Sequence, residues 1–211
     1  SLRIDRFINE GTLNNLTQKT TGNYNQTALS PKFGIVFQPV KNKIALFGNY
    51  MNGFKNVANA TQPDGTVSSF EPQQANQWEA GVKVYVLKNK LSGSVSYYNM
   101  LISNTLRPAL INNQTFTVQD GTQRSKGIEA ELTGNPFPGF NFVSGYSYND
   151  NRYIKAAANL VGKRNVGAPR ETANLWMSYS LLKGSLKGVG IGGGFLYVSE
   201  TYLNSSNTFT L

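Results

Sequence analysis

The chain has 211 residues, of which 39% are hydrophobic, and its formal net charge is +9. Histidine and cysteine are both absent, which excludes disulfides, thiol nucleophiles, histidine-dependent catalytic triads and the usual zinc sites. No apolar run approaches the roughly 18 residues that a membrane-spanning helix requires. We therefore expect a protein that is not an enzyme, with no catalytic residues and no metal or cofactor site.

Segments rich in aromatic and β-branched residues follow one another along the chain and predict about nine antiparallel strands. In chain order the predicted strands cover residues 2–7, 31–38, 44–54, 77–87, 91–106, 122–134, 140–153, 170–182 and 189–202. Several of these exceed the five or six residues that are usual in a soluble sheet. Their length matches a tilted crossing of a membrane by a β-strand.

The connectors between these strands alternate between short and long. The short connectors are residues 39–43, 88–90, 135–139 and 183–188, and the long ones are residues 8–29, 55–76, 107–121 and 154–169. A bacterial outer-membrane barrel has tight turns at its periplasmic rim and long loops at its outer rim, whereas a soluble sandwich has no reason to sort its connectors in this way. The pattern predicts an all-β, antiparallel transmembrane β-barrel segment with its short turns in the periplasm.

Alternation with a period of two separates a polar face from an apolar face in each strand. Between residues 77 and 87, Glu79 and Lys83 fall on the polar face, while Trp78 and the valines fall on the other. Glu129 and Glu131 likewise share the polar face of their strand, where their carboxylates could lie about 6 to 7 Å apart. In a wide barrel the polar face lines the lumen, so we expect these four charged residues in a wet lumen wall rather than in a catalytic pair.

Several motifs, in order along nearly the whole chain, resemble the barrel domain of TonB-dependent siderophore receptors. They are ALSPKFGIVFQPV at 28–40, FGNYMNGF at 47–54, FEPQQANQWEAGVK at 70–83, QDGTQRSKGIEAE at 119–131, NPFPGF at 135–140, YSYND at 146–150 and PRETANLWMSY at 169–179. The resemblance implies a barrel of about 22 strands in the bacterial outer membrane, plugged by an N-terminal domain. It also implies import of a ferric siderophore with energy delivered through TonB.

The chain departs from the family pattern because it contains no plug, no TonB box and no final strand that ends in an aromatic residue. Nine is also an odd number of strands, whereas single-chain bacterial barrels have an even number. We therefore expect residues 1–211 to be part of a larger barrel, with the plug domain and the final strands outside this chain.

Aromatic and cationic residues at or beyond the outer strand ends are the candidates for ligand contact, because a ferric siderophore is bulky and often anionic. The alternative is that they contact anionic lipopolysaccharide or other loops. The lumen residues Glu79, Lys83, Glu129 and Glu131 are expected to face the plug. The candidate ligand-binding residues are Phe54, Phe70, Arg107, Phe116, Tyr153, Lys163, Arg164 and Tyr202.

Three functions fit the sequence to different degrees. The leading hypothesis is the importer, with ferric siderophore, the plug, TonB, outer-membrane lipid and lipopolysaccharide as partners, although cobalamin or a glycan could replace the siderophore as cargo. The second is a small self-contained barrel that acts as an adhesin or a pore. The third is a soluble basic domain that binds nucleic acid, but many lysines fall in the short turns instead of along one groove, so we expect no nucleic-acid partner.

Overall fold

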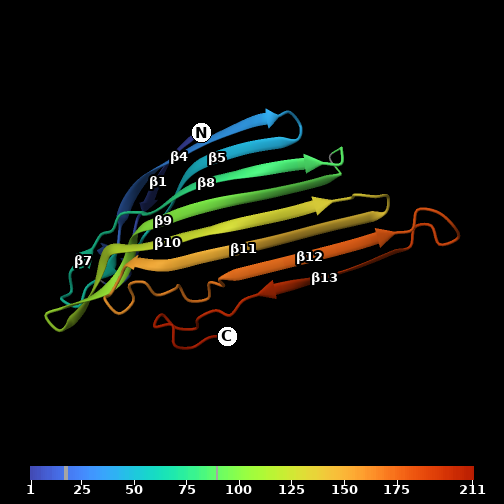
Figure 1. Ribbon diagram of the computed structural model, residues 1–211. Coiled ribbons are helices and arrows are strands. Elements are labelled where there is room, and N and C mark those ends of the chain that lie inside the picture. Colours follow the sequence, from blue (N-terminus) through green and yellow to red (C-terminus); the bar gives the residue numbers. More distant parts are fainter. Residues whose placement is uncertain (17–18, 89) are drawn as a thin grey trace.

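The computed structural model describes residues 1–16, 19–88 and 90–211. These residues form one nine-stranded antiparallel sheet and two short two-stranded hairpins. Figure 1 shows the strands of the large sheet lying side by side as a single curved layer, with the N-terminal strands at one edge and the C-terminal strands at the other. The predicted number of strands in the sheet is confirmed.

The order of the strands across the large sheet is β1-β4-β5-β8-β9-β10-β11-β12-β13, which is also their order along the chain. This meander is the simplest antiparallel topology, because each connection only has to reach the adjacent strand. The strands are β1 (Leu2–Asn9), β4 (Tyr24–Val40), β5 (Ile44–Lys55), β8 (Gln73–Val86), β9 (Leu91–Ile111), β10 (Gln114–Gly134), β11 (Phe140–Lys155), β12 (Glu171–Ser180) and β13 (Gly190–Val198). The two small hairpins pair β2 (Thr12–Asn14) with β3 (Lys19–Thr21) and β6 (Ala60–Thr61) with β7 (Val67–Ser68).

The strands meet through short connections at one end of the sheet, at residues 41–43, 87–90, 135–139 and 181–189. Residue 89, which belongs to the predicted short connector 88–90, lies outside the described residues. At the other end, long connections at residues 10–23, 56–72 and 156–170 contain the small hairpins and irregular segments. The prediction of a long connector in each of these three places is confirmed. The first two are shorter than predicted, because β4 and β8 begin earlier than the sequence predicts.

The predicted long loop over residues 107–121 is wrong. Here β9 continues to Ile111 and β10 begins at Gln114, so only Asn112 and Asn113 separate the two strands. Both have positive φ, of 49° and 59°, as the two central residues of a type I′ hairpin turn require. The segment contains proline, asparagine and an Asp-Gly pair, which usually mark loops, and it shows no clean alternation, so its strand character was missed.

The large sheet has one polar face and one apolar face, and the apolar face is the exposed one. Trp78, Tyr97 and Ile128 of that face are 46%, 38% and 46% exposed. Buried apolar side chains are confined, among the described residues, to Ala28, Ala45, Val57 and Tyr98. A sheet that exposes its apolar side chains and lacks a hydrophobic core is typical of a barrel wall that faces lipid outside and water inside.

Large aromatic side chains lie across glycines of neighbouring strands on the polar face. Phe47 is opposite Gly81, and a Cβ atom at Gly81 would lie 2.6 Å from Phe47 Cζ. Tyr98 is opposite Gly127, where a Cβ would lie 2.8 Å from the tyrosine hydroxyl. Each ring occupies the volume that a side chain would need, which explains these glycines.

Among the described residues, no helix is long and apolar enough to cross a membrane.

Candidate functional site

The four charged residues predicted for the lumen lie together in one hollow on the polar face. The hollow has a volume of about 460 Å³, and Glu79, Lys83, Glu129 and Glu131 all line it. The strand register brings them together, because Lys83 of β8 and Glu131 of β10 both lie opposite Ser94 of β9. Directly opposite residues of antiparallel strands point to the same side of the sheet, so all four share the polar face.

The four lumen charges are not neutralised by ion pairs within the described part of the sheet. None of the ion pairs that the structure shows among its described residues includes any of the four. In the same part of the chain, no group of three or more acidic side chains is arranged to hold a metal ion. The hollow therefore offers three carboxylates and one ammonium group to a polar partner.

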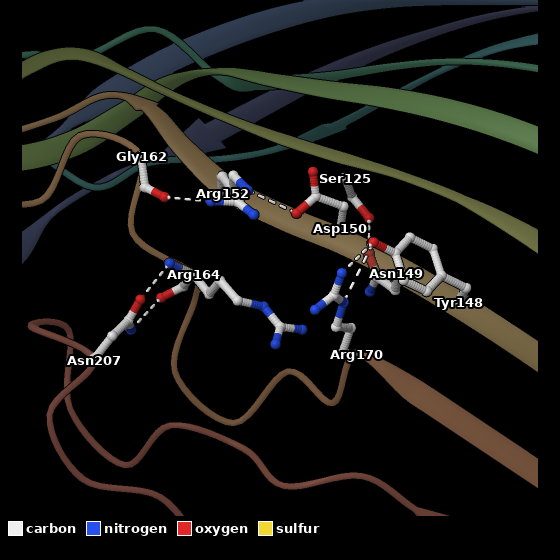
Figure 2. Close-up of polar contacts among 9 residues, drawn as sticks. All are labelled: Ser125, Tyr148, Asn149, Asp150, Arg152, Gly162, Arg164, Arg170 and Asn207. Atoms are coloured by element: carbon white, nitrogen blue, oxygen red, sulfur yellow. Dashed lines mark hydrogen bonds and ion pairs between the residues drawn. The ribbon is translucent and has the colours of Figure 1, made fainter.

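A second hollow, of about 690 Å³, lies at the opposite end of the sheet from the short turns and is rich in cations. Its lining brings together three of the predicted ligand-binding residues, Lys163, Arg164 and Tyr202. It also contains Arg152 and Arg170, which the sequence did not single out. Figure 2 shows the three arginine side chains gathered beside the outer part of β11.

The contacts in this hollow hold its backbone and two of its arginines in place. The Asn207 amide accepts a hydrogen bond from the Arg164 backbone at 2.6 Å and donates one to the Arg164 carbonyl at 2.9 Å. Arg152 pairs with Asp150 at 2.7 Å and donates to the Gly162 carbonyl at 3.0 Å. The dashed lines of Figure 2 mark these contacts, which fix the loop against β11.

Arg170 lies across the ring of Tyr148, 5.1 Å from its centroid. It donates two hydrogen bonds to the tyrosine hydroxyl, at 2.9 Å and 3.3 Å. This hydroxyl is the main reason that the pKa of Arg170 is raised above its usual value. A guanidinium over an aromatic face is restrained in direction while it keeps donors free for another group.

The remaining predicted ligand-binding residues do not enter the cationic hollow. Arg107 forms a two-point ion pair with Asp120, including a bond of 2.9 Å, and Lys155 approaches the same carboxylate at 3.3 Å. Phe54 lies beneath the guanidinium of Arg3. The others occupy separate places: the carbonyl of Phe70 accepts a hydrogen bond from Gln26, Phe116 is opposite Ala109 in the β9–β10 hairpin, and Tyr153 is opposite Gln123 at the outer part of β11.

A family model, curated proteins and solved structures all match this chain, and all of the matches reported below are receptors of one kind. The family model for the β-barrel of TonB-dependent receptor-like proteins matches residues 1–211. The ferrioxamine B receptor of Salmonella typhimurium is 31% identical over 170 residues, which cover 81% of this chain and 24% of that receptor. The metal-pseudopaline receptor CntO of Pseudomonas aeruginosa is 26% identical over 215 residues, which cover 98% of this chain and 29% of that receptor. The crystal structure of BauA, the ferric preacinetobactin receptor of Acinetobacter baumannii, superposes with a TM-score of 0.75 at 26% identity, over 89% of this chain and 28% of BauA.

This chain belongs to the TonB-dependent receptors. Its strands are accordingly those of a bacterial outer-membrane β-barrel, as the connector pattern predicted. The chain spans about a quarter of the length of these two curated relatives. In an outer-membrane barrel the short turns are periplasmic, so the cationic hollow lies toward the outer surface of this receptor.

Sequence reasoning missed Arg152 and Arg170 because both were read as strand or strand-end residues without a partner. A signal was available: Arg170 directly precedes a strand and follows Pro169, at the end of a long connector. Arg152 lies two residues after Asp150 on the same face of its strand, a spacing that favours an ion pair. Only the fold of residues 156–170 shows that both border the same hollow as Lys163 and Arg164.

Proposed function

We propose that this chain forms part of the barrel of an outer-membrane receptor that imports a ferric siderophore with energy delivered by TonB. The observation that carries the proposal is the match of the whole chain to the TonB-dependent receptor barrel, together with relatives named as receptors for ferrioxamine B and ferric preacinetobactin. A polar inner face and an apolar outer face support it, since a wide barrel that passes a hydrophilic cargo needs both.

In this proposal the nine strands are a section of a larger barrel, of about 22 strands, whose plug domain and remaining strands lie outside residues 1–211. The sheet has a paired neighbour on only one side of β1 and of β13 among the described residues. Exposed strand edges recruit further strands or aggregate. Strands from the rest of the receptor would pair with these edges and close the barrel.

The lumen hollow is the proposed contact surface for the plug. Glu79, Lys83, Glu129 and Glu131 present charged groups that form no ion pair within the part of the chain that the structure describes. A plug domain that fills the lumen can supply donors for the carboxylates and an acceptor for the lysine. Charge-assisted hydrogen bonds of this kind are stronger than neutral ones and also fix orientation.

The outer ends of the strands are the proposed entry route of the cargo. Tyr153 is well placed for contact, because it lies opposite Gln123 on the same face as the lumen residues Ser125 and Glu129. Phe70 is half-buried on the long connection between β5 and β8, whose backbone is held by Gln26 and Gln119. Aromatic side chains held in this way can pack against a rigid iron complex at low entropic cost.

Uptake of radioactive iron tests the proposal in a strain that expresses the full-length receptor and no other siderophore receptor. We expect accumulation of iron from ferric ferrioxamine B, ferric preacinetobactin or ferrichrome, for which a related transporter of Escherichia coli is named, in cells with TonB. We expect no accumulation in cells without TonB. The matched control is the same strain without the receptor. Uptake that continues at the same rate without TonB would contradict the proposal and favour a pore.

A second cargo class is favoured by one observation. The metal-pseudopaline receptor aligns with 98% of this chain, whereas the ferrioxamine B receptor aligns with 81%. A metal complex other than a ferric siderophore is therefore a specific alternative. Uptake of metal-pseudopaline, with no uptake of the three ferric complexes, would establish this alternative in place of the siderophore.

A further inference from the structure

Three arginines lie in one row across the outer part of the sheet. Arg124 of β10 is directly opposite Arg152 of β11, and Arg152 is in turn opposite Arg164 in an isolated antiparallel bridge. Side chains directly opposite one another start from Cβ atoms about 4.5–5.5 Å apart, and like charges in such positions are destabilising. A row of three guanidinium groups is therefore unfavourable unless an anion lies among them.

The row lies on the outward, apolar face of the sheet. Along β10, Arg124 alternates with the lumen-side Ser125 and shares its face with Ile128, which is exposed. At the other end of the row, the residue after Arg164 is Asn165, whose amide donates to Gln123 at 2.7 Å. Because Gln123 belongs to the lumen face, Arg164 lies on the outward side of its segment.

The charges of the row are only partly balanced within the protein. Asp150 pairs with Arg152. Nε of Arg124 and Nη2 of Arg164 are buried atoms that have no hydrogen-bond partner among the described residues. A buried donor without a partner costs free energy that a bound acceptor would recover. The adjoining hollow of about 690 Å³ adds Arg170, which lies against the outward residue Tyr148, and its lining also includes Lys163 and two acidic residues, Glu171 and Glu200.

On the outward face, aromatic side chains lie next to the row, on the side toward the short turns and the middle of the membrane. Trp78 and Tyr97, both on the outward face, are packed with ring centroids 5.3 Å apart. Tyr148, whose ring lies under the guanidinium of Arg170, is opposite Ile128 on the same face. Tryptophan and tyrosine on a lipid-facing surface settle at the level of the headgroups. The arginines therefore lie at the height of lipid phosphates in the outer leaflet.

We propose that Arg124, Arg152 and Arg164, with Arg170 at their side, bind a phosphate group of the phosphorylated glycolipid of the outer leaflet, lipid A. Arginine forks match phosphate oxygens in pairs, and a phosphate among them would offset the repulsion between the three like charges of the row. The cargo is not the expected occupant, because the row faces away from the lumen through which cargo passes. The site does not depend on which cargo the receptor imports.

Lipid binding to the purified full-length receptor in neutral detergent tests this site. The probes are lipid A with two phosphates, monophosphoryl lipid A and lipid A without phosphate, titrated by native mass spectrometry. The variant Arg124→Gln/Arg152→Gln removes two charges of the row, and Lys183→Gln/Lys187→Gln removes two charges from a short turn at the other rim. We expect at least tenfold weaker binding of bisphosphorylated lipid A to the arginine variant, no change in the lysine variant, and little discrimination by the arginine variant between phosphorylated and unphosphorylated lipid.

Folding and cargo uptake provide the controls. Heat-modifiable migration on gels shows that each variant is folded, and Arg124→Lys/Arg152→Lys keeps the charge while it removes the two-point geometry, so it should give an intermediate loss. Uptake of the ferric complex should be unchanged by Arg124→Gln, because Arg124 lies outside the lining of the cationic hollow. Equal weakening in the lysine variant, unchanged lipid binding in the arginine variant, or lost cargo binding with lipid binding intact would each overturn the site.

Discussion

At the scale of single residues, the polar face combines aromatic rings placed over glycines with charged side chains that form no ion pairs among the described residues. The rings of Phe47 and Tyr98 occupy the space above Gly81 and Gly127. The charges of the lumen hollow instead point into open space. The first pattern stabilises the wall itself, while the second is proposed to serve a partner that fills the lumen, so substitutions at the two kinds of position should have different effects.

Substitution of Gly81 by alanine should destabilise the full-length receptor by about 1–3 kcal/mol. The new Cβ would lie 2.6 Å from both Phe47 Cζ and the Val95 carbonyl oxygen, and the backbone oxygen cannot move away without breaking the sheet. Gly193→Ala is the matched control, because nothing lies within 4 Å of a Cβ at that strand position. The measurement is the urea midpoint of unfolding in detergent, and equal midpoints for the two variants would contradict the packing argument.

Substitution of Glu131 by alanine should loosen the plug without affecting cargo affinity. Glu131 lines the lumen hollow on the face that the proposed plug would contact. Removal of Tyr153 or Phe70 should instead weaken binding of the ferric complex by about 2 kcal/mol, near thirtyfold, if the side chain is a desolvated contact. The paired measurements are a binding titration and leakage of a large antibiotic into cells that express the full-length receptor. Normal binding in the two aromatic variants, with binding abolished by Glu131→Ala alone, would place recognition in the lumen instead.

At the scale of elements, the β9–β10 hairpin is the element that differs most from the sequence-based prediction. Its strands have 21 residues each, and its outer part is stabilised by the Arg107–Asp120 ion pair with Lys155. The hairpin also contacts the neighbouring connection, because the Gln62 side chain bonds to the backbone of Thr117 in both directions, at 2.8 Å and 2.9 Å. The outer part of the receptor is thus a supported hairpin where a free loop was expected.

The double variant Asn112→Ala/Asn113→Ala should loosen the tip of this hairpin. Both residues have positive φ, which costs alanine roughly 1–2 kcal/mol per residue. We expect faster amide hydrogen exchange over residues 106–119 of the full-length receptor, with no change in β5 or β12. Replacement of both asparagines by glycine retains the turn geometry and should leave exchange near its original rate. If the alanine and glycine variants exchange equally fast, turn conformation does not control the hairpin.

At the scale of the whole molecule, the sheet divides its surroundings in two ways, once across its thickness and once along its strands. Across the sheet, the apolar outward face and the polar inner face separate lipid from the lumen. Along the strands, the short turns and the long connections separate the periplasm from the outside. The combination places the arginine row outward and toward the outer surface, while the lumen charges lie inward.

Cysteine labelling of intact cells should report this orientation. The chain has no cysteine of its own, so single cysteines can be introduced at exposed sites of this part of the full-length receptor. Cysteines at Asp64 and Asn159, on long connections, should react with an impermeant thiol reagent. Cysteines at Lys41 and Ser185, in short turns, should react only after the outer membrane is opened. The reverse pattern would invert the topology and move the cationic hollow to the periplasm.

The strands, their faces and most of their connections could be predicted from the order of the amino acids. Alternation between residues 77 and 87 follows from the local chemistry of a strand with lipid on one side and water on the other, and connector length is a property of the chain alone. The shared polar face of Glu79, Lys83, Glu129 and Glu131 could be predicted for the same reason. Each depends only on the face to which a residue points.

Which segments meet one another depends on the folded sheet. The row formed by Arg124, Arg152 and Arg164 comes from three separate segments, and it depends on the register of β10 with β11 and on the path of residues 156–170. That register includes an irregularity between Thr122 and Gln123, which shifts the pairing beyond it. A shift of one residue would send a side chain to the opposite face. Local patterns contain no information on such long-range pairings, so only the folded sheet shows an arginine row outside the barrel wall and separate charges within it.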